Sequence, residues 1–329
     1  MANHPEVKAS TRDRVQAVAA KLGYSPNPSA KAMLTGRTNT LGVVLADVEN
    51  PFFAQALRAI TDTARAAGYD VILANTDEHD EAERAAVQLM LDKRVDGIIL
   101  SPSNQLEIEH LQRAAASVPL VLIDRKIPAL NADTVVIDNF AAAYHAVSHL
   151  TELGHRRIAV TSNATRPSED VPYISSIAER FDGVKAALRA AGITAGADDF
   201  WIGGWTLPVS DSAVARFVTD PPTAILATDS LVALSALAAA RRAGLRVPED
   251  LSVITFDSSP WSEAFTPALS VVSQPVRELG STAARMLIER VTGSLEPARE
   301  IQLPGALVAR ESTAPAAMAA QPSASAPPA

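Results

Sequence analysis

Short runs of Val, Ile and Leu recur along this chain, and a stretch of helical length follows most of them. Uninterrupted apolar runs such as LGVVLA (41–46) are typical of strands that are buried on both faces of a parallel sheet. The expected strands lie at 41–46, 71–75, 97–101, 120–124, 135–138, 157–162, 200–203, 224–229 and 251–257. The expected helices lie at 52–67, 81–93, 106–115, 141–153, 177–191, 210–218 and 231–243. This alternation predicts an α/β fold, and the number of repeats favours two lobes with parallel sheets over one sheet.

Length and composition exclude several classes of protein. The chain has 329 residues, enough for two or three domains with large apolar cores. It contains no cysteine, which excludes disulfides and thiolate chemistry and fits a reducing cytoplasm. Apolar runs stay well short of the ~20 residues needed to span a bilayer. Charged residues near the start, including Glu6, Lys8 and Arg12, argue against a signal peptide. We therefore expect a cytoplasmic protein without a membrane partner.

Charge is distributed unevenly along the chain. Residues 1–37 carry six basic and two acidic side chains, a net charge of +4, whereas the whole chain carries −8. The remaining residues therefore carry −12. A basic arm on an acidic body suits a small DNA-contacting element joined to a sensor, because attraction to phosphates is local. A solvated basic helix is the alternative interpretation.

The first and last segments differ from the α/β body. Ser10 can cap a helix over 10–22, and Gly23 can end that helix. A turn at 24–28 and a short helix over 29–34 follow. The segment from Ala314 onward is rich in Ala, Pro and Ser, which predicts a disordered tail over 314–329.

Polar and aromatic residues follow the expected strands in both halves of the chain. Ligands of parallel α/β sheets bind beyond the carboxyl ends of the strands, so these residues predict a site in a cleft between two lobes. Aromatic faces beside carboxylate, guanidinium and amide groups suit a small polyol. The strand-end candidates are Asn50, Phe52, Phe53, Asp124, Arg125, Asp138, Asn139, Thr228, Asp229, Asp257 and Gln274.

Several of these residues also have a purely structural interpretation. Phe53 can be a core residue, and Asp124 with Arg125 can be an ion pair at a strand end. The more favoured role for Asp229 is the N-cap of the helix over 231–243. Asp257 has no obvious helix to cap, so a ligand role is favoured for it. Trp261 lies near the same rim and can pack on a lobe or touch the ligand.

The sequence offers little for catalysis or metal binding. Three histidines on or beside one helix, His145, His149 and His155, have no carboxylate or cysteine at metal-binding spacing. Dinucleotide and phosphate-loop motifs are absent, as is a nucleophile constellation. We therefore predict no metal site, no cofactor and no enzymatic activity.

The N-terminal segment PEVKASTRDRVQAVAAKLGYSPNPSAKAMLTGRTNT (5–40) resembles the end of the DNA-binding headpiece and the hinge of the lactose-repressor (LacI/GalR) family. The body is similar to the two-lobed, periplasmic-binding-protein-like sensor of that family, and the resemblance covers 5–313. It is carried by TGRTNTLGVVLADVENPFFAQALRAI, VDGIIL, VLIDR, ERFDGVKAAL and PALSVVSQPVRELGSTAARML, among others. The resemblance implies a partial helix-turn-helix headpiece over 1–26, a hinge helix and linker over 27–39, and an effector-binding and dimerisation domain over 40–313. In the family, the first two headpiece helices, about twenty residues, precede the segment at which this sequence starts.

The resemblance also assigns roles to residues of the cleft. Phe52 and Phe53 match aromatics that stack on the ligand, and Asp124 with Arg125 matches a pair that grips sugar hydroxyls. Arg180 matches a clamp between the lobes, and Trp205 matches an aromatic that packs on the effector in some members. Thr228 departs from the pattern, in which an Asn is frequent. The implied effector-binding set is Asn50, Phe52, Phe53, Asp124, Arg125, Asn139, Arg180, Trp205, Asp257 and Gln274.

On the DNA side, the segment 29–34 matches the hinge helix, which folds when paired across a dimer. There Ala30 permits close approach and Lys31 lies beside the phosphates. Met33 stands where the family inserts a Leu wedge into the minor groove, with Leu34 next. The alternative is that this segment is a disordered linker. The implied DNA-binding set is Asn27, Ala30, Lys31, Met33 and Leu34.

These features imply a cytoplasmic homodimer that represses transcription at operator DNA, if the headpiece is complete in vivo. Its effector is expected to be a monosaccharide rather than a purine, which would need more stacking surface. A sugar sensor with a deficient headpiece that does not read operators specifically is the alternative. A third interpretation, an exported sugar-binding component of a transporter, is disfavoured by PSAKAMLTGRT (28–38) and by the charged start of the chain.

Overall fold

The computed structural model describes residues 9–21, 36–164 and 172–316. Within this range, α1 spans Ala9–Lys21, close to the helix expected over 10–22. The five candidate DNA-binding residues, Asn27, Ala30, Lys31, Met33 and Leu34, lie outside the described residues, as does the short helix expected there. Their roles stay predictions.

The first lobe is built on a six-stranded sheet in which every pairing is parallel. Its strand order is β11-β5-β4-β3-β1-β2. Buried aliphatic residues join α3 and α11 to one face and α4 and α5 to the other. The strands are β1 (Thr40–Leu45), β2 (Asp70–Asn75), β3 (Gly97–Leu100), β4 (Leu120–Ile123), β5 (Asp133–Ile137) and β11 (Glu300–Leu303). The helices are α3 (Pro51–Ala66), α4 (Asp80–Asp92), α5 (Glu109–Ser117) and α11 (Val276–Val291).

The second lobe repeats this plan with the order β12-β10-β9-β8-β6-β7, except that β12 is antiparallel to β10. Apolar clusters place α6 and α7 on one face and α8 and α9 on the other. The strands are β6 (Ile158–Ser162), β7 (Phe200–Ile202), β8 (Ala224–Ala227), β9 (Ser252–Phe256), β10 (Ser270–Ser273) and β12 (Ala306–Val308). The helices are α6 (Asn139–Glu152), α7 (Ser175–Ala190), a 3-10 helix (Ala197–Asp199), α8 (Asp211–Thr219), α9 (Ser230–Arg242) and α10 (Pro260–Ala264).

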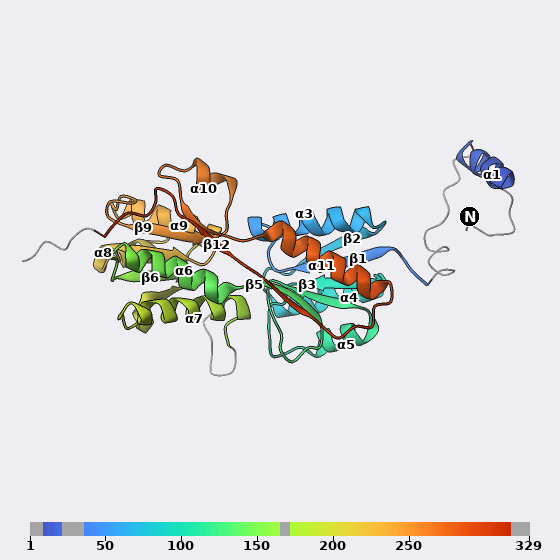
Figure 1. The fold of residues 1–329 in the computed structure, drawn as a ribbon, viewed down its shortest axis with the longest axis horizontal. Helices are drawn as coiled ribbons and strands as arrows, with labels where there is room; N and C mark the ends of the chain where they lie inside the picture. Colours follow the sequence, from blue (N-terminus) through green and yellow to red (C-terminus); the bar gives the residue numbers. More distant parts are fainter. Residues whose placement is uncertain (1–8, 22–35, 165–171, 317–329) are drawn as a thin grey trace, which may run out of the picture.

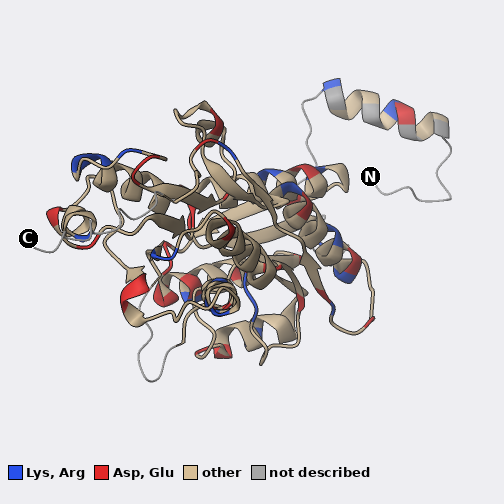
Figure 2. Cartoon of the chain, turned by 60° about the vertical axis from the view of Figure 1, so that its left-hand side comes forward, with Lys and Arg blue, Asp and Glu red and all other residues tan. Residues whose placement is uncertain are grey.

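The chain crosses between the lobes three times, between β5 and α6, between β10 and α11, and between β11 and β12. Figure 1 shows the two lobes side by side, with α11 packed beside α3 in the first lobe although it follows a strand of the second. In Figure 2, the colours of charged residues fall mainly on helices and loops, while the strands are mostly in the colour of uncharged residues. The predicted two-lobed α/β fold with mostly parallel sheets is confirmed.

Every strand and helix expected in the body is present, with ends displaced by three residues at most. Six further elements, α10, α11, β10, β11, β12 and the 3-10 helix, were not among the expected elements. The prediction of a disordered tail from residue 314 is wrong for 314–316. The amide of Ala314 donates to Ser252 Oγ over 3.1 Å, and the amide of Ala316 donates to the carbonyl oxygen of Leu153 over 2.8 Å. These bonds fix the segment to the second lobe.

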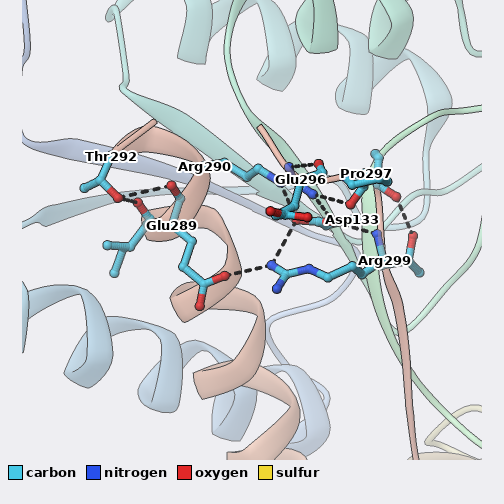
Figure 3. Close-up of polar contacts among 10 residues, drawn as sticks. Asp133, Glu289, Arg290, Thr292, Glu296, Pro297 and Arg299 are labelled. Atoms are coloured by element: carbon cyan, nitrogen blue, oxygen red, sulfur yellow. Dashed lines mark hydrogen bonds and ion pairs between the residues drawn. The ribbon is translucent and has the colours of Figure 1, made fainter. Parts of the chain in front are cut away.

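The segment that leads from α11 to β11 is held by the buried carboxylate of Asp133 (Figure 3). Asp133 accepts hydrogen bonds from Arg290 Nε and Nη2 and from the backbone amide of Arg299, each over 2.8 Å. Arg290 also donates to the carbonyl oxygen of Pro297 over 2.8 Å, and Glu289 pairs with Arg299 over 2.8 Å. This Asp133 network joins the start of β5 to the end of α11.

Close packing of α11 on α3 depends on Gly280. A Cβ at this position would lie 2.5 Å from the carbonyl oxygen of Ala56 and 3.1 Å from the Cβ of Ala59. Helix backbone cannot move aside without separating the two helices. We therefore expect Gly280→Ala to lower the free energy of unfolding by about 1–3 kcal/mol, despite the better helix propensity of alanine. Urea unfolding measures this loss. Arg277→Ala, on the exposed face of the same helix, is the control, and an equal loss in both variants would contradict the packing argument.

Candidate functional site

A cavity of about 480 Å³ lies between the lobes, where the carboxyl ends of the two sheets face each other. Its volume is within the range of about 300–1,000 Å³ typical of small-molecule sites. Residues of both lobes line it, as the strand-end argument predicts. The structure places eight of the ten candidate effector residues in its wall: Asn50, Phe52, Phe53, Asp124, Arg125, Arg180, Asp257 and Gln274.

The aromatic part of the wall is formed by the start of α3. Asn50 is the N-cap of this helix, and its Oδ1 accepts a hydrogen bond from the amide of Phe52 over 3.0 Å. The rings of Phe52 and Phe53 meet edge to face, with centroids 5.1 Å apart. Both rings are buried, line the cavity and belong to the apolar core of the first lobe. Phe53 is therefore a core residue, and its ring also forms part of the cavity wall.

Arg125 is paired with a residue that the sequence analysis missed. Its guanidinium donates two hydrogen bonds to Glu78, over 2.5 and 2.6 Å, and one to the carbonyl oxygen of Pro102 over 2.8 Å. Arg125 Nε lies 3.4 Å from Asp124 Oδ2. Burial raises the pKa of the Asp124 carboxyl, and Arg125 only partly opposes this rise. The pKa of Arg125 is itself raised, because Glu78 outweighs the lowering effect of burial.

Arg180 enters the cavity from α7 and is held by its own lobe. Its Nε donates to Asn139 Oδ1 over 2.8 Å, and its Nη1 donates to the carbonyl oxygen of Thr228 over 2.5 Å. The guanidinium also lies over the ring of Phe256, 4.0 Å from its centroid. Burial lowers the pKa of Arg180, against the effect of three surrounding carboxylates. Asn139 does not line the cavity; it lies behind Arg180 and orients it.

Asp257 and Gln274, which both follow strands of the second lobe, form a polar wall of the cavity. Asp257 Oδ1 accepts a hydrogen bond from Gln274 Nε2, whereas Gln274 Oε1 is buried without a partner among the described residues. Burial raises the pKa of Asp257 to about 7, although Arg180 opposes this. Asp257 and Asp124 follow topologically equivalent strands, and both have left-handed backbones, with φ of 71° and 70°. Strained backbones of this kind are frequent at functional sites.

Asp229 also lines the cavity, but its carboxylate caps a helix. It accepts hydrogen bonds from the amides of Leu231 and Val232, over 2.9 and 2.8 Å, at the start of α9. The N-cap interpretation is confirmed. Burial is also the main cause that raises the pKa of Asp229.

The structure places Trp205 apart from the other candidates. Its ring stacks on Trp201 with centroids 5.9 Å apart, and its indole Nε1 donates to the carbonyl oxygen of Trp201 over 2.8 Å. The residue is buried in the apolar cluster under α8 and α9 and does not line the cavity. Trp261 lies in α10, packs against the same cluster and likewise does not line the cavity.

The sequence analysis missed several wall residues on the loops that follow β1, β2 and β3. They follow strands that it had placed correctly, so the strand-end rule could have found them. The missed first-lobe residues are Asp47, Glu78, His79, Asp80, Ser103, Asn104 and Gln105.

The described residues contain neither a metal-binding cluster nor a membrane-spanning helix. No group of three or more His, Asp or Glu side chains there is arranged to hold a metal ion. The helices of the described ranges are too short or too polar to cross a membrane.

Two lobes with parallel sheets around a cavity at their facing strand ends define a periplasmic-binding-protein-like effector domain. The chain belongs to the LacI family. The family model described as "Periplasmic binding proteins and sugar binding domain of LacI family" matches residues 38–311.

Relatives of the chain are transcription regulators. It is 31% identical over 293 residues to the HTH-type transcriptional repressor CytR of Escherichia coli K12. This alignment covers 88% of this chain and 84% of the relative. It is 33% identical to catabolite control protein A of Priestia megaterium, with 94% and 92% covered. These relatives are repressors and regulators rather than enzymes, so the chain is a ligand-responsive regulator of the LacI type.

Solved structures agree with this assignment. A putative ribose operon repressor from Burkholderia thailandensis superposes with a TM-score of 0.73 at 32% identity, covering 83% of this chain and 99% of that one. A LacI family regulator from Enterococcus faecium with bound ribose has a TM-score of 0.70 at 28% identity, with 84% and 99% covered.

Proposed function

We propose that this chain is a transcription regulator that binds a monosaccharide between its lobes and, as a homodimer, binds operator DNA through its N-terminal segment. It acts in the cytoplasm, where operator DNA is found. The observation that carries the proposal is the composition of the cavity wall, which combines two aromatic rings with carboxylate, guanidinium and amide groups. Ring faces cover the C–H surface of a sugar, and the polar groups satisfy its hydroxyls. Relatives named for ribose make an aldopentose the first ligand to test.

Binding would act on the relative position of the lobes, which already touch near the cavity. Gln105 Nε2 donates to the carbonyl oxygen of Tyr173 over 2.7 Å. The amide of Lys126 donates to Ser175 Oγ over 2.7 Å, and Lys126 Nζ lies 3.0 Å from Glu179. A sugar held by Asp124 from one lobe and Asp257 from the other adds contacts that favour one lobe arrangement. Only this difference in affinity between arrangements shifts the equilibrium, by about 1–3 kcal/mol in typical allosteric proteins.

The test combines two titrations. Calorimetry with D-ribose, the other aldopentoses and two hexoses identifies the sugar. Fluorescence anisotropy with palindromic duplexes, at several salt concentrations, then measures operator affinity with and without that sugar. Salt-dependent, sugar-sensitive binding supports the regulator. Sugar binding with duplex affinity that is only nonspecific favours the alternative, a sugar sensor that does not read operators. Absence of any sugar binding refutes both.

Sugar affinity is expected to depend on pH through Asp257. The pKa of this carboxyl is raised to about 7 by burial, and only its ionised form is a strong acceptor for a sugar hydroxyl. Affinity should therefore fall as pH decreases from about 8 to about 6, by up to about tenfold. Calorimetry across this range measures the change. Asp257→Asn should bind more weakly but with a flat profile, and a wild-type profile equally flat would contradict the assignment.

A further inference from the structure

Among the described residues, carboxylates outnumber cationic side chains in the wall of the cavity. The described arginines of the wall are Arg125 and Arg180, and its described histidine is His79. The carboxylates are Asp47, Glu78, Asp80, Asp124, Asp229 and Asp257. A ligand with an added negative charge therefore enters against this excess.

Both arginines already donate hydrogen bonds to acceptors within the protein. Glu78 occupies both terminal nitrogens of Arg125 in a bidentate pair, and Pro102 accepts a further bond. Asn139 and Thr228 take two of the donors of Arg180. Phosphate is recognised best by a guanidinium whose paired N–H groups are available. Because Glu78 accepts hydrogen bonds from Nη1 and Nη2 of Arg125, these two nitrogens are not available together for a phosphate.

Among the described residues, the polar wall formed by Asp257 and Gln274 has one buried acceptor without a hydrogen-bond partner. Gln274 is 8% exposed, lines the cavity and has a buried Oε1 without a partner among the described residues. Beside it, Asp257 uses Oδ1 for the side chain of Gln274. An unpaired buried acceptor costs free energy until a donor reaches it. A hydroxyl supplies such a donor, whereas an ionised phosphate oxygen cannot.

Resting on the proposed function, we infer that the cavity selects the uncharged sugar over its phosphate ester, and that Glu78 sets this selectivity by occupying Arg125. Glu78 is positioned for this role by the turn after β2, where its amide donates to the carbonyl oxygen of Ala46 over 3.1 Å. A phosphate ester carries roughly −1.5 to −2 charges near neutral pH. The reaction class that removes the effector is then phosphoryl transfer to the sugar.

The experiment measures a ratio of two affinities in the full chain. Isothermal titration compares D-ribose with D-ribose 5-phosphate at fixed ionic strength and at about pH 8; if another sugar binds better in the panel above, that sugar and its phosphate replace them. We expect the ester to bind the wild type at least about 100-fold more weakly than the sugar. Glu78→Gln keeps the size of the side chain but removes its charge. It should narrow this ratio by about tenfold or more, mainly through tighter binding of the ester.

Asp77→Asn is the matched control. Asp77 is the neighbouring carboxylate, is exposed and does not line the cavity, so its removal changes the charge equally without freeing Arg125. Its ratio should stay close to that of the wild type. Equal affinity of the wild type for sugar and ester overturns the selectivity but leaves the proposed function intact. Equal shifts in both variants overturn the role of Glu78. Thermal melting confirms that each variant is folded.

Discussion

Replacing Arg180 with methionine is expected to weaken effector binding by at least about 100-fold, equivalent to about 3 kcal/mol. Arg180 opposes the raised pKa values of Asp229 and Asp257, and it assists Arg125 in opposing that of Asp124. Methionine keeps the apolar stem of the side chain but removes the guanidinium, and with it the charge, the bonds to Asn139 and Thr228 and the contact with the ring of Phe256. Without Arg180, these carboxyls hold their protons more tightly and become weaker acceptors for hydroxyls. Isothermal titration with the identified sugar measures the loss.

Arg189→Met is the control for this substitution. Arg189 lies in the same helix, α7, but is exposed and does not line the cavity. Its variant should bind the sugar within about twofold of the wild type. A folded Arg180→Met protein that binds normally would show that the cavity is not the effector site.

The largest loss of stability is expected from Asp133→Asn. The Asp133 carboxylate has no exposed surface, and Arg290 and the amide of Arg299 donate to it (Figure 3). Asparagine removes the charge that pairs with Arg290 and turns an NH2 group toward one of the donors, and loss of a partner in a buried ion pair costs about 3–5 kcal/mol. Urea unfolding at neutral pH measures this loss. Glu289→Gln, at the exposed edge of the same network, should lose less than about 1 kcal/mol.

The difference in unfolding free energy between the wild type and Asp133→Asn should decrease at low pH. Burial alone would raise the pKa of Asp133, but its bonds with Arg290 and Arg299 lower it overall. The stabilisation is therefore complete above the unfolded pKa of about 3.9 and is lost as pH falls through the lower folded value. Wild type and Asp133→Asn should converge in stability as the solution is acidified below about pH 4. A difference that stays constant would mean that the carboxylate charge is not what stabilises the network.

The sequence analysis identified the elements whose signal is local. Runs such as GIIL of β3 and AILA of β8 are short, apolar and bounded by polar residues, which is the pattern of a buried strand. It missed β11, EIQL, because half of that strand is polar, and β12, ALV, because it has only three residues. In α11, Gly280 interrupts the helix signal, since its reason for being there is the contact with α3.

In the site, too, residues with a local sequence signal were predicted, whereas residues that depend on tertiary contacts were not. Asp124, Arg125 and Asp257 were found because they directly follow strands and carry the family resemblance. The partnership of Arg125 with Glu78 spans 47 residues and depends on how the turn after β2 is folded, which no local pattern encodes. Trp205 was assigned by resemblance, but its indole nitrogen and ring find their partners in Trp201 and in the core. Whether a side chain turns to the cavity or to the core depends on tertiary packing.

Helix α11 has a mechanical consequence. It starts two residues after Gln274, in the cavity wall, and its last residue, Val291, accepts a hydrogen bond from Arg37 over 3.0 Å. Next to Arg37, the amides of Thr38 and Asn39 bind the carboxylate of Asp96 over 2.8 Å each. The 16 residues of α11 span about 24 Å without a break. Helix α11 thus connects the cavity wall at its first residue with residues 37–39 at its last residue, so a tilt imposed at one end displaces the other.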